Sequence, residues 1–342
     1  MKDGQISRRR PTQADVAELA SVSQAMVSYV INNTPSVSIP EETRTRVLDA
    51  VRTLGYVPQS TARSLRTRKT STVAGILPDI TNPFYPAFER GIQDVAEIHG
   101  YDLITCNTDG IEEKELKYLR LAEQGRVDGF VAVLFHVSAV HLRSLLERGV
   151  AIVRLEPARK EVGPLSLDNI YVDNAAAAQT ATSYLIERGH RTIAMLGGQN
   201  GPQHRRVLGY CQALVAHGLP INEALIQGDG FKEDNGYHAM RYVLGRMPRP
   251  TAVFAANDLI AMGALAALRD TGLRVPDDIA VVGFDDIPAA KLVSPPLTTI
   301  SQFPEQLGRR AAEMLFERLE GTVTGGGRCE LMPHELIVRE SA

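Results

Sequence analysis

The 342-residue chain contains no tryptophan and only three cysteines, Cys106, Cys211 and Cys329, which lie far apart in the sequence. No Cys-x-x-Cys pair and no cluster of cysteine with histidine occurs, so neither a disulfide framework nor a zinc site is supported. We therefore predict that the protein has no metal and no other cofactor. Each cysteine is expected to serve as a small buried apolar residue.

Long apolar runs are also missing. No run approaches the roughly 20 residues that are needed to cross a bilayer. The N-terminal stretch MKDGQISRRRPTQ lacks the apolar centre of a signal peptide. These absences predict a cytoplasmic protein that has no membrane partner.

The short motifs of common enzyme classes do not occur. The eight histidines are scattered, and there is no Gly-x-Ser-x-Gly, His-Glu-x-x-His or P-loop sequence. The glycine run at 325–327 precedes Arg328 rather than Lys and Ser or Thr, so it is read as a turn. The chain is therefore not expected to be an enzyme.

Charge is distributed unevenly, although the net charge is only −3. Residues 1–70 contain eleven Lys and Arg against six Asp and Glu, whereas the remainder contains twenty-six against thirty-four. A basic N-terminal segment on an acidic body favours a polyanionic partner that meets the N-terminus. An ordinary solvated surface would also account for such an imbalance.

Residues 12–33, TQADVAELASVSQAMVSYVINN, have the spacing of two short helices joined by a tight turn. Thr12 and Asp15 are placed to cap the first helix. Val16, Leu19 and Ala20 then recur at helical spacing and are expected to face inward.

Ser23 is placed to cap the second helix, in which Val27, Val30 and Ile31 form the inward stripe. Small and hydrogen-bonding side chains are left facing outward, namely Gln24, Ala25, Ser28 and Tyr29. Such a helix fits the major groove of DNA, where amides and hydroxyls read base edges. An ordinary helical hairpin is the alternative. A third helix at about 41–54 would close a three-helix core through Val47, Leu48, Val51 and Leu54.

From Thr72 onward the pattern changes to short apolar runs that alternate with helical stretches. The runs are 73–77, 103–106, 130–134, 150–155, 192–196, 252–255 and 279–283. Near-continuous apolar strands separated by helices indicate parallel sheets that are covered on both faces. So many units over about 270 residues predict two α/β lobes rather than one.

Blocks of sequence along nearly the whole chain resemble those of the LacI/GalR family of bacterial transcriptional regulators. They are Asp15-Val16-Ala17, Val22-Ser23, Val27-Ser28, Asn32, Leu54-Gly55-Tyr56-Val57-Pro58, Ala62-Arg63-Ser64-Leu65, Asn82-Pro83-Phe84-Tyr85, Gly189-His190-Arg191, Asn257-Asp258, Gly283-Phe284-Asp285-Asp286 and Pro296-Leu297-Thr298-Thr299-Ile300.

The resemblance implies an all-α helix-turn-helix DNA-binding head and an α/β two-lobed periplasmic-binding-protein-like core with two parallel sheets flanked by helices. The expected head is 1–57, the hinge helix or linker is 58–71, and the effector-binding and dimerisation core is 72–342. Within the core we expect an N-lobe at about 72–171 and 301–327. The C-lobe is expected at about 172–298 and 328–342.

The resemblance also implies which residues meet double-stranded operator DNA. In the head these are Thr12, Gln13, Ser23, Gln24, Ala25, Ser28, Tyr29 and Asn32. In the linker they are Ser60, Ala62, Arg63 and Leu65, where Leu65 resembles the residue that relatives wedge between base steps of the minor groove. From composition alone, residues 58–70 would be a flexible linker.

Three positions depart from the family pattern and bear on this carry-over. Met26 replaces the usual Thr, and Tyr29 stands where many relatives have Arg, so the operator sequence of well-known members should not be copied. Ser21 replaces a common turn glycine and would be strained if the turn needs a positive φ.

Polar residues directly after strands predict a ligand cleft, because ligands of open α/β sheets lie at the carboxyl ends of the strands. Arg, Asn and Asp with an aromatic ring are the groups that grip sugars. The predicted effector residues are Asp79, Phe84, Tyr85, Arg154, Arg206, Phe231, Asn257 and Asp285. Phe84, Arg206, Asn257 and Asp285 also resemble positions that line the effector cleft in the family, and Phe231 is included because several relatives have a stacking aromatic there.

Plainer roles remain open for part of this set. Asn82, Asn257 and Asp258 are also placed to cap helices. Phe84 could be a core residue, and Glu156 could simply pair with Arg154.

Together these observations predict a ligand-responsive transcriptional regulator of the repressor type that binds a pseudo-palindromic operator as a homodimer. Its expected effector is a small sugar or sugar derivative, and release from DNA is the expected response. A sugar-binding protein of the transport type without a DNA role is the alternative.

Overall fold

The computed structural model describes residues 11–32, 37–57, 69–198 and 201–342. The chain divides into two compact units, Met1–Thr70 and Ser71–Ala342. No helix among the described residues has the length and apolar character that would be needed to cross a membrane.

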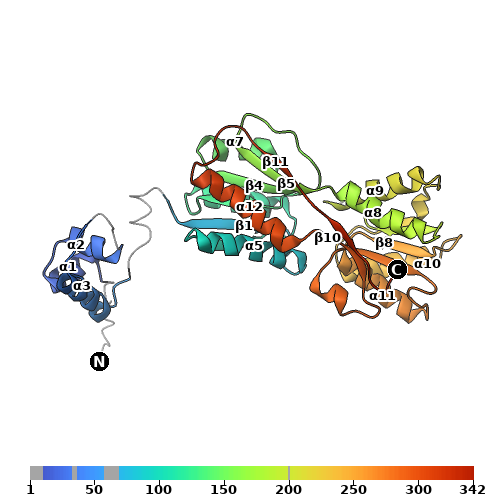
Figure 1. Cartoon of the computed structure of the whole chain (residues 1–342), viewed down its shortest axis with the longest axis horizontal. Helices are drawn as coiled ribbons and strands as arrows, with labels where there is room; N and C mark the ends of the chain where they lie inside the picture. The colour runs from blue at the N-terminus through green and yellow to red at the C-terminus, as the bar shows by residue number, and fades with distance from the viewer. Residues whose placement is uncertain (1–10, 33–36, 58–68, 199–200) are drawn as a thin grey trace, which may run out of the picture. The chain divides into compact units, whose positions relative to one another are not determined.

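The described residues of the first unit form three helices, α1 (Gln13–Ala20), α2 (Gln24–Ile31) and α3 (Glu41–Leu54) (Figure 1). Both predicted caps are present. The Thr12 amide donates to Asp15 at 2.6 Å and the Asp15 amide donates back to the Thr12 hydroxyl at 3.4 Å, while Ser23 accepts from the Met26 amide at 3.2 Å. Ser21 has a φ of +52°, so the strain expected at this turn is confirmed.

The core of the head consists of small and β-branched residues. Its buried members are Val16, Ala17, Ala20, Val27, Val30, Val47 and Ala50. The predictions for Leu19 and Leu48 were wrong, because these side chains are 51% and 42% exposed. Ala17 and Ala20 already form the inward face of α1, and Val47 and Ala50 that of α3, so both leucines point outward.

The second unit contains two six-stranded sheets (Figure 1). The first has the order β11-β5-β4-β3-β1-β2, and all its neighbouring strands are parallel. Its strands are β1 (Thr72–Leu77), β2 (Asp102–Asn107), β3 (Gly129–Ala132), β4 (Ala151–Glu156), β5 (Leu167–Val172) and β11 (Cys329–Met332).

The second sheet has the order β12-β10-β9-β8-β6-β7 and is parallel except for the antiparallel pair of β10 and β12. Its strands are β6 (Ile193–Leu196), β7 (Ile226–Gln227), β8 (Ala252–Ala255), β9 (Ala280–Asp285), β10 (Thr298–Ser301) and β12 (Glu335–Ile337). The two-lobed α/β architecture with mostly parallel sheets is thus confirmed.

Helices cover both faces of the first sheet, because alternate residues of β1 pack on opposite sides. Val73 and Leu77 join the cluster that contains α5 (Phe84–Ile98) and α12 (Pro304–Leu319). Ala74 and Ile76 join the cluster that contains α6 (Glu112–Glu123) and α7 (Ala139–Glu147).

The second sheet is covered by two helix pairs (Figure 1). One pair is α8 (Asn174–Glu187) with α9 (Gln203–Ala216), and the other is α10 (Glu233–Leu244) with α11 (Asp258–Asp270). Two 3-10 helices, η1 (Glu223–Leu225) and η2 (Pro288–Lys291), lie in loops of this lobe. Of the cysteines, Cys106 is buried, but Cys211 and Cys329 are only half-buried, contrary to expectation.

The chain passes between the lobes three times, from β5 to α8, from β10 to α12 and from β11 to β12. The third passage lies later than we expected. Cys329 to Met332 pair in parallel with Asn169 to Val172 of β5, so this stretch belongs to the first lobe rather than the second.

Candidate functional site

A cavity of about 570 Å³ lies in the second unit and is lined by residues from both lobes. The first lobe contributes the loop after β1, residues 133–139 after β3, and the end of β4 with the loop that follows it. The second lobe contributes residues around the starts of α8, α9 and α11 and the end of β9. The cavity therefore lies where the carboxyl ends of the strands meet, as in other open α/β sheets.

Arg206 of α9 is held at one end of this cavity by three kinds of contact. Its Nε donates to Oδ1 of Asn174 at 2.7 Å, and its Nη1 donates to the carbonyl of Ala256. The same Nη1 lies 3.7 Å from Oδ1 of Asp285, and the guanidinium sits 3.7 Å from the centroid of the Phe284 ring. Burial lowers the pKa of Arg206, and the nearby Asp285 opposes that shift.

Asp285 ends β9 with an unusual backbone, because its φ is +118°. Non-glycine residues rarely adopt such angles, and they do so mostly at functional sites. Its carboxylate accepts from Nε2 of Gln302 at 2.7 Å. Burial raises the pKa of Asp285 to about 6, while the Arg206 charge and the Gln302 hydrogen bond act in the opposite direction.

A second polar group lines the cavity at the end of β4 and in the loop after it. Arg154 donates from Nε and Nη2 to Oδ1 of Asn169, at 3.2 and 3.0 Å. Its Nη2 also lies 3.1 Å from Oε1 of Glu156, whose Oε2 lies 3.4 Å from Nζ of Lys160. The Arg154 and Glu156 side chains are only 10% and 9% exposed, so this charge pair is largely withdrawn from water.

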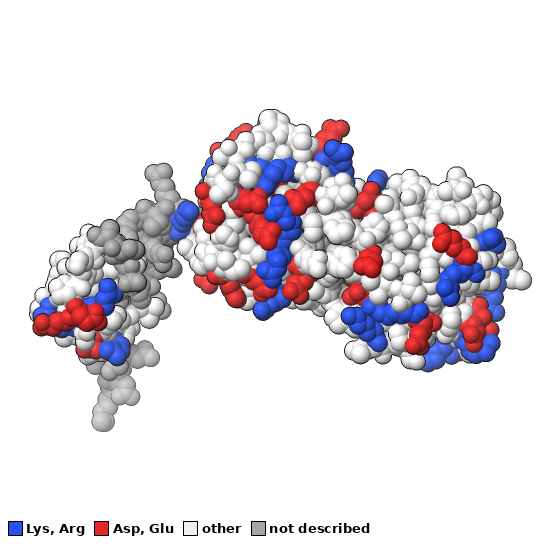
Figure 2. Space-filling model, in the orientation of Figure 1, with Lys and Arg blue, Asp and Glu red and all other residues white. Residues whose placement is uncertain are grey.

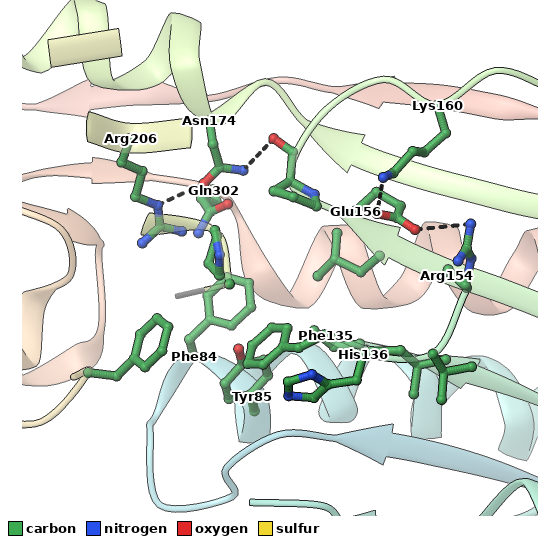
Figure 3. A pocket seen from close by; sticks show the side chains of 18 of the residues that line it. Phe84, Tyr85, Phe135, His136, Arg154, Glu156, Lys160, Asn174, Arg206 and Gln302 are labelled. Carbon is green, nitrogen blue, oxygen red and sulfur yellow. Dashed lines mark hydrogen bonds and ion pairs between the residues drawn. The ribbon is translucent and has the colours of Figure 1, made fainter. Parts of the chain in front are cut away.

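Aromatic side chains lie between the two polar groups (Figure 3). Phe84 and Tyr85 pack edge to face with ring centroids 5.2 Å apart. Phe135 of the first lobe and Phe231 of the second have nearly parallel rings, 6.2 Å apart and 15° from coplanar. Burial raises the pKa of Tyr85, so its hydroxyl stays protonated and able to donate.

A buried carboxylate holds the loop that carries Phe135. Glu115 of α6 accepts hydrogen bonds from three consecutive amides, those of Phe135, His136 and Val137, at 2.8, 3.1 and 3.0 Å. Three backbone donors on one carboxylate fix the path of this loop.

Seven of the eight predicted effector residues line the cavity, namely Phe84, Tyr85, Arg154, Arg206, Phe231, Asn257 and Asp285. Asp79 does not, since its carboxylate instead accepts from the amide of Thr81 at 2.9 Å and so shapes the loop before α5. Asn257 caps α11 through the Ile260 amide, as considered from the sequence, and it also lines the cavity.

Sequence reasoning missed several lining residues, including Phe135, His136, Lys160, Asn174 and Gln302. Gln302 directly follows β10 and would have been found if that strand had been predicted. Within the described ranges, no group of three or more His, Cys, Asp or Glu is arranged to hold a metal ion.

In the head, the side chains predicted to meet DNA lie at the surface or near it. Ser23, Gln24, Ala25 and Asn32 are exposed, and Thr12, Gln13, Ser28 and Tyr29 are partly exposed. Gln13 donates to the carbonyl of Gln24 at 2.9 Å, and Asn32 donates to the Ser28 hydroxyl at 3.1 Å. The linker residues Ser60, Ala62, Arg63 and Leu65 lie outside the described part of the chain.

Comparison with known proteins decides the family. The model of bacterial regulatory proteins of the lacI family matches residues 12–59, and that of the periplasmic binding protein-like domain matches residues 182–342. The HTH-type transcriptional regulator RegA of Clostridium saccharobutylicum is 37% identical over 330 residues, which cover 96% of this chain and 98% of RegA. The chain belongs to the lacI family.

Two further relatives of this lacI-family protein support the assignment to the family. The HTH-type transcriptional repressor PurR of Vibrio campbellii is 36% identical over 334 residues, covering 96% of this chain and 98% of PurR. The solved complex of the transcriptional regulator CelR with cellobiose is 36% identical and covers 97% of this chain and all of that one, with a TM-score of 0.71.

As a lacI-family member, the protein is a transcriptional regulator with a helix-turn-helix head. In that motif α1 and α2 are the paired helices, and α2 takes the place of the helix that reads the major groove. The relatives described above are regulators rather than enzymes.

Proposed function

We propose that the protein is a repressor that binds a pseudo-palindromic operator as a homodimer, and that a small sugar-like effector in the cavity controls this binding. The observation that carries the proposal is the buried set of Arg206, Asn174, Asn257 and Asp285 beside aromatic rings, in a chain that also has a DNA-binding head. Planar bidentate groups combined with rings suit the hydroxyl edges and C–H faces of a sugar.

The relatives support both halves of this proposal. PurR of Vibrio campbellii is named a repressor, and the CelR structure holds cellobiose. The head offers the exposed residues Ser23, Gln24, Ala25 and Asn32 to the major groove, with Ser28 and Tyr29 beside them. We assign the minor-groove contact to the linker through Ser60, Ala62, Arg63 and Leu65, as in the resemblance described above.

We propose that the protein dimerises through its second unit. β2 is an edge strand of the first sheet, and Ile104 on it is 41% exposed, while Ile98 at the end of the adjacent α5 is 75% exposed. Edge strands and exposed apolar residues mark surfaces that are commonly covered by another chain. Two heads on one dimer would then read the two halves of a palindrome.

Control by the effector follows from population shift. A sugar that contacts both lobes stabilises the arrangement in which those contacts are made, and it can change operator affinity only by its differential affinity for two states of the body. We propose release from DNA as the response.

The test begins with operator selection from genomic fragments and a thermal-shift screen of sugars, since a bound ligand raises apparent stability by mass action.

Two variants then separate the two halves of the proposal. In a gel-shift titration, Arg206→Ala should keep operator affinity and lose the response to the sugar. Leu65→Gly should weaken operator binding by at least about tenfold, because the minor-groove wedge is removed, and should leave sugar affinity unchanged. No preference for any palindrome over bulk DNA would refute the proposal.

A further inference from the structure

The cavity has two polar ends that are separated by rings (Figure 3). The first end, which we call the Arg206 end, consists of Arg206, Asn174, Asp285 and Gln302. The second, the Arg154 end, consists of Arg154, Glu156 and Lys160. In Figure 3 the labelled side chains of both ends lie above Phe84, Tyr85 and Phe135, those of the Arg206 end to the left and those of the Arg154 end to the right.

The cavity is larger than one sugar ring requires. Its volume is about 570 Å³. A single hexose has about a dozen heavy atoms and, at the packing density of a protein interior, occupies on the order of 200 Å³. One ring bound at the Arg206 end would therefore leave the Arg154 end filled with water.

The Arg154 end offers both a donor and an acceptor. The hydrogen bonds of Arg154 to other described residues use Nε and Nη2, so Nη1 makes none within this part of the chain. Glu156 has one ion-pair contact at each carboxylate oxygen, which leaves lone pairs for a further donor. A hydroxyl can accept from Arg154 and donate to Glu156 at once, whereas neither a purely apolar group nor a bare anion can do both.

A charged ligand is disfavoured at the same place. The two positive charges of this end, on Arg154 and Lys160, are matched by two negative ones. Glu156 lies 3.1 Å from Arg154 and 3.4 Å from Lys160, and the exposed Glu161 lines the same end. A ligand carboxylate that reached Arg154 would also approach Glu156, whose side chain is only 9% exposed, and two like charges that are largely shielded from solvent repel strongly. The group that fits is a neutral polyol.

The middle of the cavity provides apolar walls for rings. Phe135 reaches from the first lobe to the second, where its ring lies parallel to that of Phe231. Gly201 of the second lobe leaves room beside this ring, since a Cβ there would lie 3.1 Å from it and crowd it. The C–H faces of sugar rings pack on such surfaces while their hydroxyl edges turn to the two polar ends.

We infer that the effector is a neutral sugar of at least two rings, with one ring at the Arg206 end and the next recognised by Arg154, Glu156 and Lys160. This inference rests on the proposed sugar effector and assigns Arg154 as the residue that determines its size and charge class.

The test is isothermal titration calorimetry of the full-length protein with three classes of sugar. Neutral disaccharides such as cellobiose, maltose and lactose are compared with their monosaccharides and with glucuronate and galacturonate. We expect at least one neutral disaccharide to bind at least about tenfold more tightly than its monosaccharides, because hydrogen bonds to charged groups at the second end are added.

Variants test whether the Arg154 end causes the preference for a disaccharide over its monosaccharides. Arg154→Met should reduce the affinity for the disaccharide to near that of the monosaccharide and leave the monosaccharide affinity within about twofold. Lys160→Met tests the same end if Arg154→Met fails to fold, since the Lys160 side chain is 48% exposed. Arg159→Met is the matched control, because Arg159 lies in the same loop but does not line this cavity.

Each other outcome has a distinct meaning. Equal affinity for one and two rings, or a disaccharide affinity that neither Arg154→Met nor Lys160→Met lowers, overturns this inference and leaves the sugar effector standing. Tighter binding of the sugar acids overturns the charge class. If no sugar of any class binds, both this inference and the proposed sugar effector are refuted.

Discussion

At the scale of single residues, Asp285 is a carboxyl group that the fold buries beside a cation without fully compensating it. Its pKa is raised to about 6, from an ordinary value of 3.8. The folded state therefore binds this proton more tightly than the unfolded chain does. The stability contributed by Asp285 is fully present below about pH 4, is lost as the pH rises to about 6, and is constant above that.

Replacing Asp285 by Asn should remove this dependence. Relative to the wild type, the free energy of unfolding of Asp285→Asn should increase by up to about 3 kcal/mol between pH 4 and pH 7. Burial and the charge of Asp285 also raise the pKa of Asp258, so the loss of that charge acts in the same direction. Urea unfolding of both proteins at pH 4.5, 6 and 7.5 measures the difference. A difference that does not change with pH would contradict the assigned pKa.

Whether a cavity residue could be predicted from the sequence depended on whether a helix, a strand or a loop carries it. Arg206 and Asp285 could be found because one lies among the apolar positions of a helix and the other follows a strongly apolar strand. Phe135 and Lys160 could not, because loops bring them to the cavity, and those loops are held by contacts distant in sequence. Glu115 fixes the first of these loops from 20 residues away.

At the scale of elements, the same principle separates the strands that were predicted from those that were not. β1, β8 and β9 are buried and almost wholly apolar, so their runs could be recognised. β5 reads LDNIYV and is equally buried, but its polar pair Asp168 and Asn169 breaks the apolar run. These two residues are tolerated inside because Arg318, Arg328 and Arg154 bond them. The partners lie elsewhere in the chain and leave no local pattern.

The element that positions Phe135 is α6, and Glu115→Gln tests its role. A glutamine side chain has one acceptor oxygen, and its amide would face backbone donors instead of accepting from them. We expect a loss of about 1–3 kcal/mol in the free energy of unfolding. We also expect at least about tenfold weaker effector affinity, because Phe135 would no longer be held against Phe231.

Glu113→Gln is the control for this prediction, since Glu113 lies on the same helix but is exposed. It should change neither quantity measurably. Denaturant titration gives the stability, and calorimetry with the sugar found in the screen gives the affinity. Unchanged affinity in Glu115→Gln, with the stability loss present, would show that the loop does not contribute to the site.

At the scale of the whole molecule, the three passages between the lobes decide how the body is assembled. The third passage could not be placed from sequence, because β11 reads CELM and is half exposed, with no apolar run to mark it. Besides its pairing with β5, β11 is tied to the first lobe through Asp168. This carboxylate is fully buried and accepts from the guanidinium of Arg318 on α12 and from both the backbone and the guanidinium of Arg328, just before β11.

A wider network of charges surrounds this anchor, and Figure 2 shows acidic and basic side chains side by side over this part of the first lobe. Arg310 pairs with Glu313, Glu317 and Glu330, and Glu317 also contacts Arg328. Burial alone would raise the pKa of Asp168, but the hydrogen bonds from Arg318 and Arg328 outweigh it and hold the pKa below its ordinary value. The carboxylate thus stabilises the fold above its unfolded pKa, and that contribution is lost as the pH falls through the lower folded value.

Buried and exposed ion pairs on α12 should therefore differ sharply in their effects. Asp168→Asn leaves two guanidinium groups without their buried anion and should cost about 3–5 kcal/mol of stability at pH 7. Glu313→Gln is the matched control. Glu313 lies on α12, pairs with Arg310 of the same helix and has a side chain that is 44% exposed, so its loss should cost no more than about 1 kcal/mol. Urea unfolding at pH 7 and again near pH 3 distinguishes them. The cost of Asp168→Asn should shrink once the pH falls below the ordinary carboxyl pKa of 3.8, because the unfolded wild-type chain then binds a proton that folded Asp168 binds less readily. Equal costs for the two variants at pH 7 would mean that β11 is held to the first lobe by its strand pairing with β5 and not by Asp168.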